Sequence, residues 1–205
     1  MGSDHIAEQG LYERMVVHEL FHVVQNTQNA TVQNQWIQDS TAEWATWHYV
    51  TEERGALTES RMPIAQNWQD TSLGRASADG RSPYGDYLWW VFAEQEFGSA
   101  ETMKMVGDMW RGLAHENPGV GTQRVLDVMA ELMDVEGILP EYAMRVLNVD
   151  LPGNPLGTQF ADYDASFPKN TMPTYAENTL GRDPVTSEWF DGMPELTFKY
   201  MVLKA

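Results

Sequence analysis

Two histidines and a glutamate stand close together in VVHELFHVVQ, residues 16–25. His18 and His22 are four residues apart, so on a helix both imidazole rings project from one face and can bind one cation. Glu19 lies about 100° further round such a helix, where its carboxylate can reach a water on that cation. Zn²⁺ binds histidine nitrogen readily and lowers the pKa of a bound water toward about 7. The spacing therefore predicts a zinc site in which Glu19 is the general base.

The alternative interpretation is a buried helix on which two histidines make ordinary hydrogen bonds. The motif has chemical meaning only on a helix, and residues 11–28 contain neither Pro nor Gly. Apolar residues recur there at helical spacing, which supplies the required element. They cover more than one stripe of the helix, so we expect it to be buried on several sides.

A third metal ligand is expected on a neighbouring element, and WIQDSTAEWATWHYV, residues 36–50, offers two carboxylates. Asp39 and Glu43 are four residues apart, so both can face the first helix if this segment is helical. One would bind the metal, and the other would accept the ring N–H of a ligand histidine. A local alternative is that Ser40 and Glu43 form a helix capping box, with Asp39 or Ser40 starting the helix.

HELFH followed by WIQDSTAEW resembles the gluzincin zinc metallopeptidases, the broad group of thermolysin, the aminopeptidases and the bacterial collagenases. Several of these carry a second motif similar to W-x-x-E-G-x-A-E-aromatic, whose first Glu is the third ligand. The matching residues are Trp36, Ala42, Glu43 and Trp44. Asp39 occupies the ligand position where the family usually has Glu, and Ser40 replaces the usual Gly. The resemblance thus implies Asp39 as ligand with Glu43 beside it, whereas thermolysin-like spacing assigns the metal to Glu43.

Peptide hydrolysis also needs a hydrogen-bond donor for the developing oxyanion. Enzymes of this group use a Tyr or His downstream of the ligands, and Tyr84, Tyr87 and His115 are available. We take Tyr84 as the candidate, at the start of YGDYLWWVFAEQEFG, a stretch that resembles the aromatic helix following the zinc motifs in similar proteins.

The resemblance implies zinc-dependent hydrolysis of a peptide or protein substrate. Two other functions compete with it: a non-catalytic binding or structural module with a degenerate metal site, and a zinc hydrolase acting on a non-peptide substrate. Gluzincins usually have a small sheet before the active-site helix, and only 17 residues precede His18. We therefore expect that sheet to be supplied elsewhere, or the chain to be a fragment.

Composition excludes other classes of function. The net charge of −17 argues against a nucleic-acid partner, because neutralising phosphates requires an excess of Lys and Arg. No apolar run approaches the length of a membrane span, and the absence of Cys excludes thiolate sites and disulfides. The start MGSDHIAEQG lacks the apolar core of a signal peptide. We expect a secreted or periplasmic hydrolase whose signal peptide is not part of this chain.

The elements that would position these residues are mainly helices. We predict a zincin-like, mainly α catalytic unit over residues 1–149, then a linker and a small β-containing extension over 150–205. Helices are expected at 11–28, from 36 or 40 to 53, and at 84–97, 100–113, 122–133 and 139–148. The tryptophans at 36, 44, 47, 89 and 90 are predicted core residues, and Glu94, Glu96 and Glu101 a solvated face. Alternation at Leu196, Phe198, Tyr200 and Val202 predicts the strand.

Overall fold

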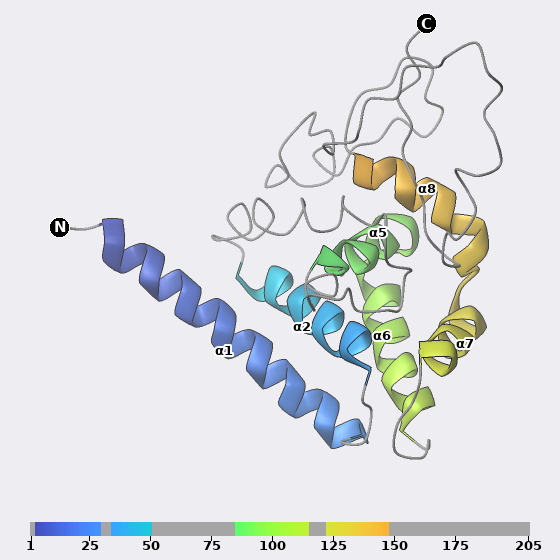
Figure 1. The fold of residues 1–205 in the computed structure, drawn as a ribbon, viewed down its shortest axis with the longest axis horizontal. Helices are drawn as coiled ribbons and strands as arrows, with labels where there is room; N and C mark the ends of the chain where they lie inside the picture. The colour runs from blue at the N-terminus through green and yellow to red at the C-terminus, as the bar shows by residue number, and fades with distance from the viewer. Residues whose placement is uncertain (1–2, 30–33, 51–84, 115–121, 148–205) are drawn as a thin grey trace, which may run out of the picture.

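The computed structural model describes residues 3–29, 34–50, 85–114 and 122–147, which form six helices and no strand (Figure 1). The prediction of a mainly α unit is confirmed for these residues. The expected β-containing extension at 150–205 and the boundary before it lie outside the described residues. Among the helices described, none combines the length and the apolar character that crossing a membrane requires.

Helices α1 (Ser3–Asn29) and α2 (Gln35–Tyr49) run antiparallel and pack side by side at one edge of the bundle (Figure 1). Asn34 caps α2, because its side-chain oxygen accepts a hydrogen bond from the Ile37 backbone N–H at 3.1 Å. The side of α2 turned away from α1 enters the core through Trp36, Ile37 and Trp47, each no more than 2% exposed. The cap and this apolar side together fix where the residues of α2 point.

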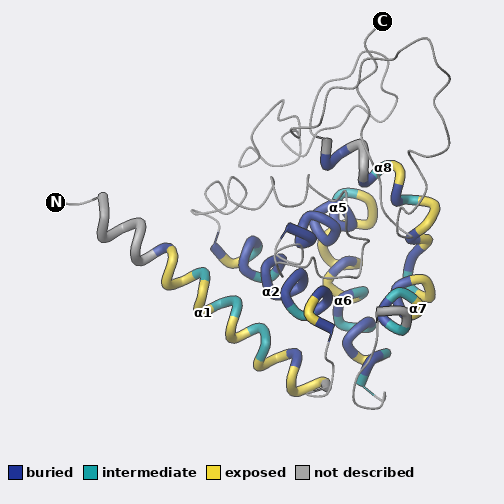
Figure 2. Tube along the Cα trace, in the orientation of Figure 1, coloured by how far each residue is buried: buried dark blue, intermediate teal, exposed yellow. Residues whose placement is uncertain are grey.

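Helix α5 (Tyr87–Phe97) forms the centre of the bundle, between α2, α6 (Ser99–Leu113) and α8 (Val135–Leu147). Every residue from 87 to 94 is buried, which fits a helix that is apolar all round (Figure 2). It ends at Gly98, whose φ of +86° is a conformation that residues with a Cβ rarely adopt. The predicted end of this helix is therefore confirmed, as is the burial of the five predicted core tryptophans.

The far side of the bundle is formed by α7 (Thr122–Leu132), which packs on α6, and by α8, which packs on α5. Arg145 joins α8 to α5 through an ion pair with Glu96 at 2.5 Å, while its guanidinium lies over the Phe92 ring. These helices support α5 and leave α1 and α2 at the opposite edge (Figure 1). The predicted metal site therefore lies between α1, the outermost helix at this edge, and α2.

Several expectations about this edge are wrong. Helix α1 starts at Ser3, not Leu11, and passes through Gly10, which costs only about 1 kcal/mol relative to Ala in a helix. It is also not buried on several sides; among the described helices its main contacts are with α2 and, to a lesser extent, α6. Large apolar residues on its other faces are exposed, namely Leu11, Tyr12, Met15, Val16, Leu20, Val23 and Val24 (Figure 2).

One of the two starts predicted for α2 is confirmed to within a residue, because the helix begins at Gln35 behind the Asn34 cap, next to Trp36 and not at Ser40. The predicted start of the last helix is wrong. Helix α8 starts at Val135 and contains Pro140. Its start is stabilised by Asp134, whose carboxylate accepts a hydrogen bond from the Gly137 N–H at 3.0 Å. A cap supplied by a side chain thus determined the start of the helix in both cases.

Candidate metal centre

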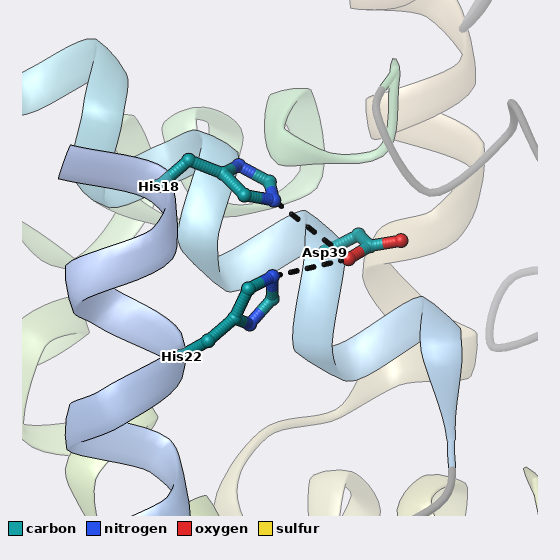
Figure 3. A group of neighbouring side chains, drawn as sticks. All are labelled: His18, His22 and Asp39. Atoms are coloured by element: carbon teal, nitrogen blue, oxygen red, sulfur yellow. Dashed lines mark ion pairs between the residues drawn. The ribbon is translucent and has the colours of Figure 1, made fainter. Parts of the chain in front are cut away.

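His18 and His22 point from α1 toward Asp39 on α2, and all three side chains converge on one point (Figure 3). The His22 Nε2 atom lies 3.4 Å from Asp39 Oδ1, and the His18 Nε2 atom lies 3.8 Å from the same oxygen. The two rings are nearly perpendicular, at 86°, with centroids 4.7 Å apart. The four-residue spacing on α1 and the antiparallel packing of α2 are sufficient to assemble this group.

The three side chains can hold one metal ion. A ligand atom from each lies within 4.8 Å of the ligand atoms of the other two. Two ligands at the usual Zn–N or Zn–O distance of about 2.0–2.1 Å in tetrahedral geometry are roughly 3.4 Å apart. The His22–Asp39 separation of 3.4 Å matches this value, and the His18–Asp39 separation of 3.8 Å is somewhat longer.

The group is partly open to solvent, as a site that admits a substrate must be. The side chains of His18, His22 and Asp39 are 12%, 24% and 11% exposed, respectively. Three protein ligands with an accessible fourth position distinguish catalytic zinc sites from structural sites, which are closed by four protein ligands. Among the described residues the donor set comprises three side chains, one fewer than the four that close a structural zinc site.

The electrostatics of the site centre on the charge of Asp39. Burial alone would raise the pKa of Asp39, but interactions with the side chains of His18, His22 and Gln35 outweigh burial and lower it. The pKa of His22 is raised, chiefly by its hydrogen bond to Asp39 and against the opposing effect of burial. Asp39 is thus ionised at neutral pH and available as an anionic ligand, and a metal ion at this site would compete with protons for His22.

Glu19 follows His18 on α1, where its side chain is exposed. Its charge is close enough to contribute to the raised pKa of His22. It does not belong to the group of side chains that could bind the ion. Glu19 therefore lies beside the ligands rather than among them, and its role as a general base stays a prediction.

The remaining predicted site residues take different positions. Glu43 lies one turn beyond Asp39 on α2 and is buried, at 4% exposure, but it is not one of the potential metal ligands found among the described residues. The geometry thus favours Asp39 over Glu43 as the third ligand. Tyr84 and His115 lie outside the described residues, and Tyr87 is fully buried in α5.

Two neighbours of the site were not identified from the sequence. Gln25, three residues after His22, has its Oε1 atom 2.7 Å from His22 Nδ1. Ser40, next to Asp39, accepts a hydrogen bond from the Trp90 indole N–H at 3.1 Å and so ties α2 to α5. The contact between His22 and Gln25 could have been predicted, because residues three apart on a helix are neighbours on its surface. The contact between Ser40 and Trp90 joins residues 50 apart in the sequence, and no local pattern indicates it.

Comparisons of the chain with protein-family models, with curated proteins and with solved structures find no match. The role of this site is therefore inferred from its own geometry and chemistry.

Proposed function

We propose that this chain is the catalytic unit of a zinc-dependent peptidase, in which His18, His22 and Asp39 hold the ion and Glu19 is the general base. The observation that carries this proposal is the convergence of Asp39 on the two motif histidines, with ligand atoms at 3.4 and 3.8 Å. The gluzincin resemblance of HELFH and WIQDSTAEW supports the same assignment. Zinc would supply Lewis-acid activation of a water and of the substrate carbonyl.

The residues of the chain then have distinct tasks in the reaction. The Glu19 carboxylate takes a proton from the attacking water as the water oxygen bonds to the peptide carbonyl carbon. When the C–N bond breaks, the same proton passes from Glu19 to the departing nitrogen, so the base is regenerated. Asp39 would supply one negative charge to a bound divalent ion and the two histidines none, so these ligands would leave a net positive charge at the site. Tyr84 remains the predicted donor to the developing oxyanion.

The identity of the metal is part of the proposal. Two histidines and one carboxylate are also the donor set of non-haem iron(II) sites. The presence of Glu19 next to His18 favours hydrolysis, because a hydrolytic site requires a base beside the activated water. Elemental analysis of the purified protein, followed by activity measurements after reconstitution with Zn²⁺ or Fe²⁺, distinguishes the two.

Glu19→Gln tests the proposed function. In folded, zinc-loaded protein this variant should bind zinc as the parent does and lose peptide cleavage by at least about 10²-fold, the usual contribution of a general base. Glu13→Gln, an exposed carboxylate on the same helix, is the matched control and should retain full activity. Equal rates for Glu19→Gln and the parent would refute the assignment.

The competing functions give different results in the same assay. Zinc bound stoichiometrically by a protein that cleaves no member of a broad peptide library would indicate a hydrolase with a non-peptide substrate. Absence of stoichiometric metal at neutral pH would instead indicate a binding or structural module with a degenerate site.

A further inference from the structure

Gln25 is a buried polar residue on α1, although the residues next to it along the helix are exposed. Only 2% of its surface is accessible, whereas Val23, Val24 and the next residue along the chain are exposed. Its side-chain amide makes three hydrogen bonds: one to His22 on its own helix, and two to α2, at Gln38 and Thr41. Gln38 and Thr41 flank Asp39 in the sequence. One amide group therefore links a metal-binding histidine to the backbone segment that carries the third ligand.

The direction of these hydrogen bonds follows from the partners on α2. The Gln38 backbone carbonyl can only accept a hydrogen bond, and it lies 2.9 Å from Gln25 Nε2. The Thr41 hydroxyl donates its single proton to the Ile37 carbonyl at 2.6 Å, so its oxygen accepts from Gln25 Nε2 at 2.9 Å. Both N–H groups of the amide are thus used. A flipped amide would oppose its oxygen to the Gln38 carbonyl and lose that bond, and it could keep a bond to Thr41 only if Thr41 gave up its bond to Ile37.

The oxygen of the same amide then determines the state of His22. Because Gln25 Oε1 can only accept, His22 Nδ1 must carry a proton to make the 2.7 Å contact. The neutral ring has one proton for two acceptors, Gln25 Oε1 at 2.7 Å from Nδ1 and Asp39 Oδ1 at 3.4 Å from Nε2. The shorter contact favours the proton on Nδ1, which leaves the lone pair on Nε2. We propose that Gln25 is a positioning residue that holds His22 in the Nδ1–H tautomer and directs its Nε2 lone pair at the metal centre.

The metal-binding part of this inference rests on the proposed zinc site, whereas the tautomer itself does not require a metal. Hydrogen bonds to the second ring nitrogen of a ligand histidine fix its tautomer and orientation, and their loss typically reduces metal affinity about 10–100-fold. Gln25 also sets the His22 ring relative to α2, so a single substitution should affect both the tautomer and the affinity.

The ring nitrogens of His22 report the tautomer directly in the metal-free protein. Long-range ¹H–¹⁵N spectra, recorded along a pH series up to the point where the ring signals stop moving, should show His22 as the Nδ1–H form in the parent. The signals are assigned by their absence in His22→Asn. An Nε2–H ring in the unsubstituted protein would overturn the inference without the need for any Gln25 variant.

Two substitutions separate tautomer control from a merely structural link between α1 and α2. Gln25→Met fills similar space without hydrogen bonds, whereas Gln25→Glu keeps an acceptor for His22 but loses both N–H donors to α2. A structural link is lost in both variants. Tautomer control predicts the Nδ1–H form in Gln25→Glu and a mixture of forms in Gln25→Met.

Zinc affinity provides the second measurement. It should fall about 10–100-fold in Gln25→Met and stay within about tenfold of the parent in Gln25→Glu. Gln28→Met, an exposed glutamine one turn further along α1, is the matched control and should leave both measurements unchanged. Gln25→Met with a pure Nδ1–H ring and the parent's affinity would overturn the inference. Loss of the tautomer in Gln25→Met, in a chain whose parent binds no zinc, would uphold it while refuting the proposed function.

Discussion

Replacing Asp39 by Asn changes one oxygen of the proposed metal centre to an amide nitrogen and removes its negative charge. The side chain keeps its size, so α2 should pack as before. The change acts on the atom that lies 3.4 Å from His22 Nε2 and 3.8 Å from His18 Nε2. A carboxamide oxygen is a poor zinc ligand compared with a carboxylate, so the variant should bind zinc through the two histidines alone.

The size of the effect follows from the number of ligands. Four-ligand zinc peptides bind their metal with about 10–16 kcal/mol, or roughly 2.5–4 kcal/mol for each ligand. Since every 1.4 kcal/mol is a factor of ten, Asp39→Asn should weaken zinc binding about 10²–10³-fold. The substitution also removes the main cause of the raised pKa of His22, which reduces proton competition and offsets part of the loss. Titrations at higher pH reduce this offset, because fewer protons then compete with the metal for His22.

Competition with a chromophoric zinc chelator measures the affinity, and Glu43→Gln is the matched comparison. Glu43 is a buried carboxylate on the same helix, one turn beyond Asp39, and lies outside the potential ligand group. Its substitution should lower affinity less than about tenfold, provided that circular dichroism shows the helical content of the parent. A larger loss in Glu43→Gln than in Asp39→Asn would refute the ligand assignment and restore the thermolysin-like one.

Other predictions concern the metal-free protein and the helices that hold the site. Because the pKa of His22 is raised in the folded state, the stabilisation from its protonation is complete below pH 6.5 and is lost as the pH rises through the folded pKa. Urea titrations in the presence of a chelator should therefore show a free energy of unfolding that falls with pH in the parent, and a much smaller fall in Asp39→Asn. Ser40→Ala should cost about 1–3 kcal/mol in the same assay, because it leaves the buried Trp90 N–H without its acceptor, and an unchanged midpoint would contradict this. His48→Leu should lower the free energy of unfolding by about 3–5 kcal/mol, because Glu94, with a fully buried side chain, loses its partner at 2.6 Å. The double variant His48→Leu/Glu94→Gln should recover part of this stability.

Local chemistry made much of the helical core predictable. Gly98 marks the end of α5 because the chain there needs a positive φ, and glycine is the residue that adopts it at no steric cost. The apolar run of α5 predicted its burial, and the tryptophans that it contributes are buried as expected. These features depend on a residue's own conformational preference or on its transfer free energy, and both are properties of the residue type.

Features that depend on contacts between helices were harder to predict from the sequence. Glu94 was predicted to be solvated, yet its carboxylate is buried against His48, which lies 46 residues away in the sequence. The apolar residues of α1 predicted burial on several sides, but their exposure depends on which helices pack there. Periodicity indicates that a face is apolar and does not indicate what covers it.

In the candidate site, too, the contacts within one helix could be predicted and the contacts between helices could not. His18, His22 and Glu19 are related by helical spacing within one element, so the sequence predicted their arrangement. The preference for Asp39 over Glu43 depends on the register between α1 and α2, and either carboxylate was compatible with the sequence. Gln25 fell within the quoted motif, but its significance depends on Gln38 and Thr41, whose positions only the packed pair of helices defines.

The central claim is that His18, His22 and Asp39 together hold one zinc ion. A crystal of the zinc-loaded protein, with diffraction data collected on both sides of the zinc absorption edge, tests it directly. The ion should lie about 2 Å from Nε2 of both histidines and from a carboxylate oxygen of Asp39. An ion held by Glu43 in place of Asp39, or the absence of an anomalous peak between α1 and α2, would contradict it.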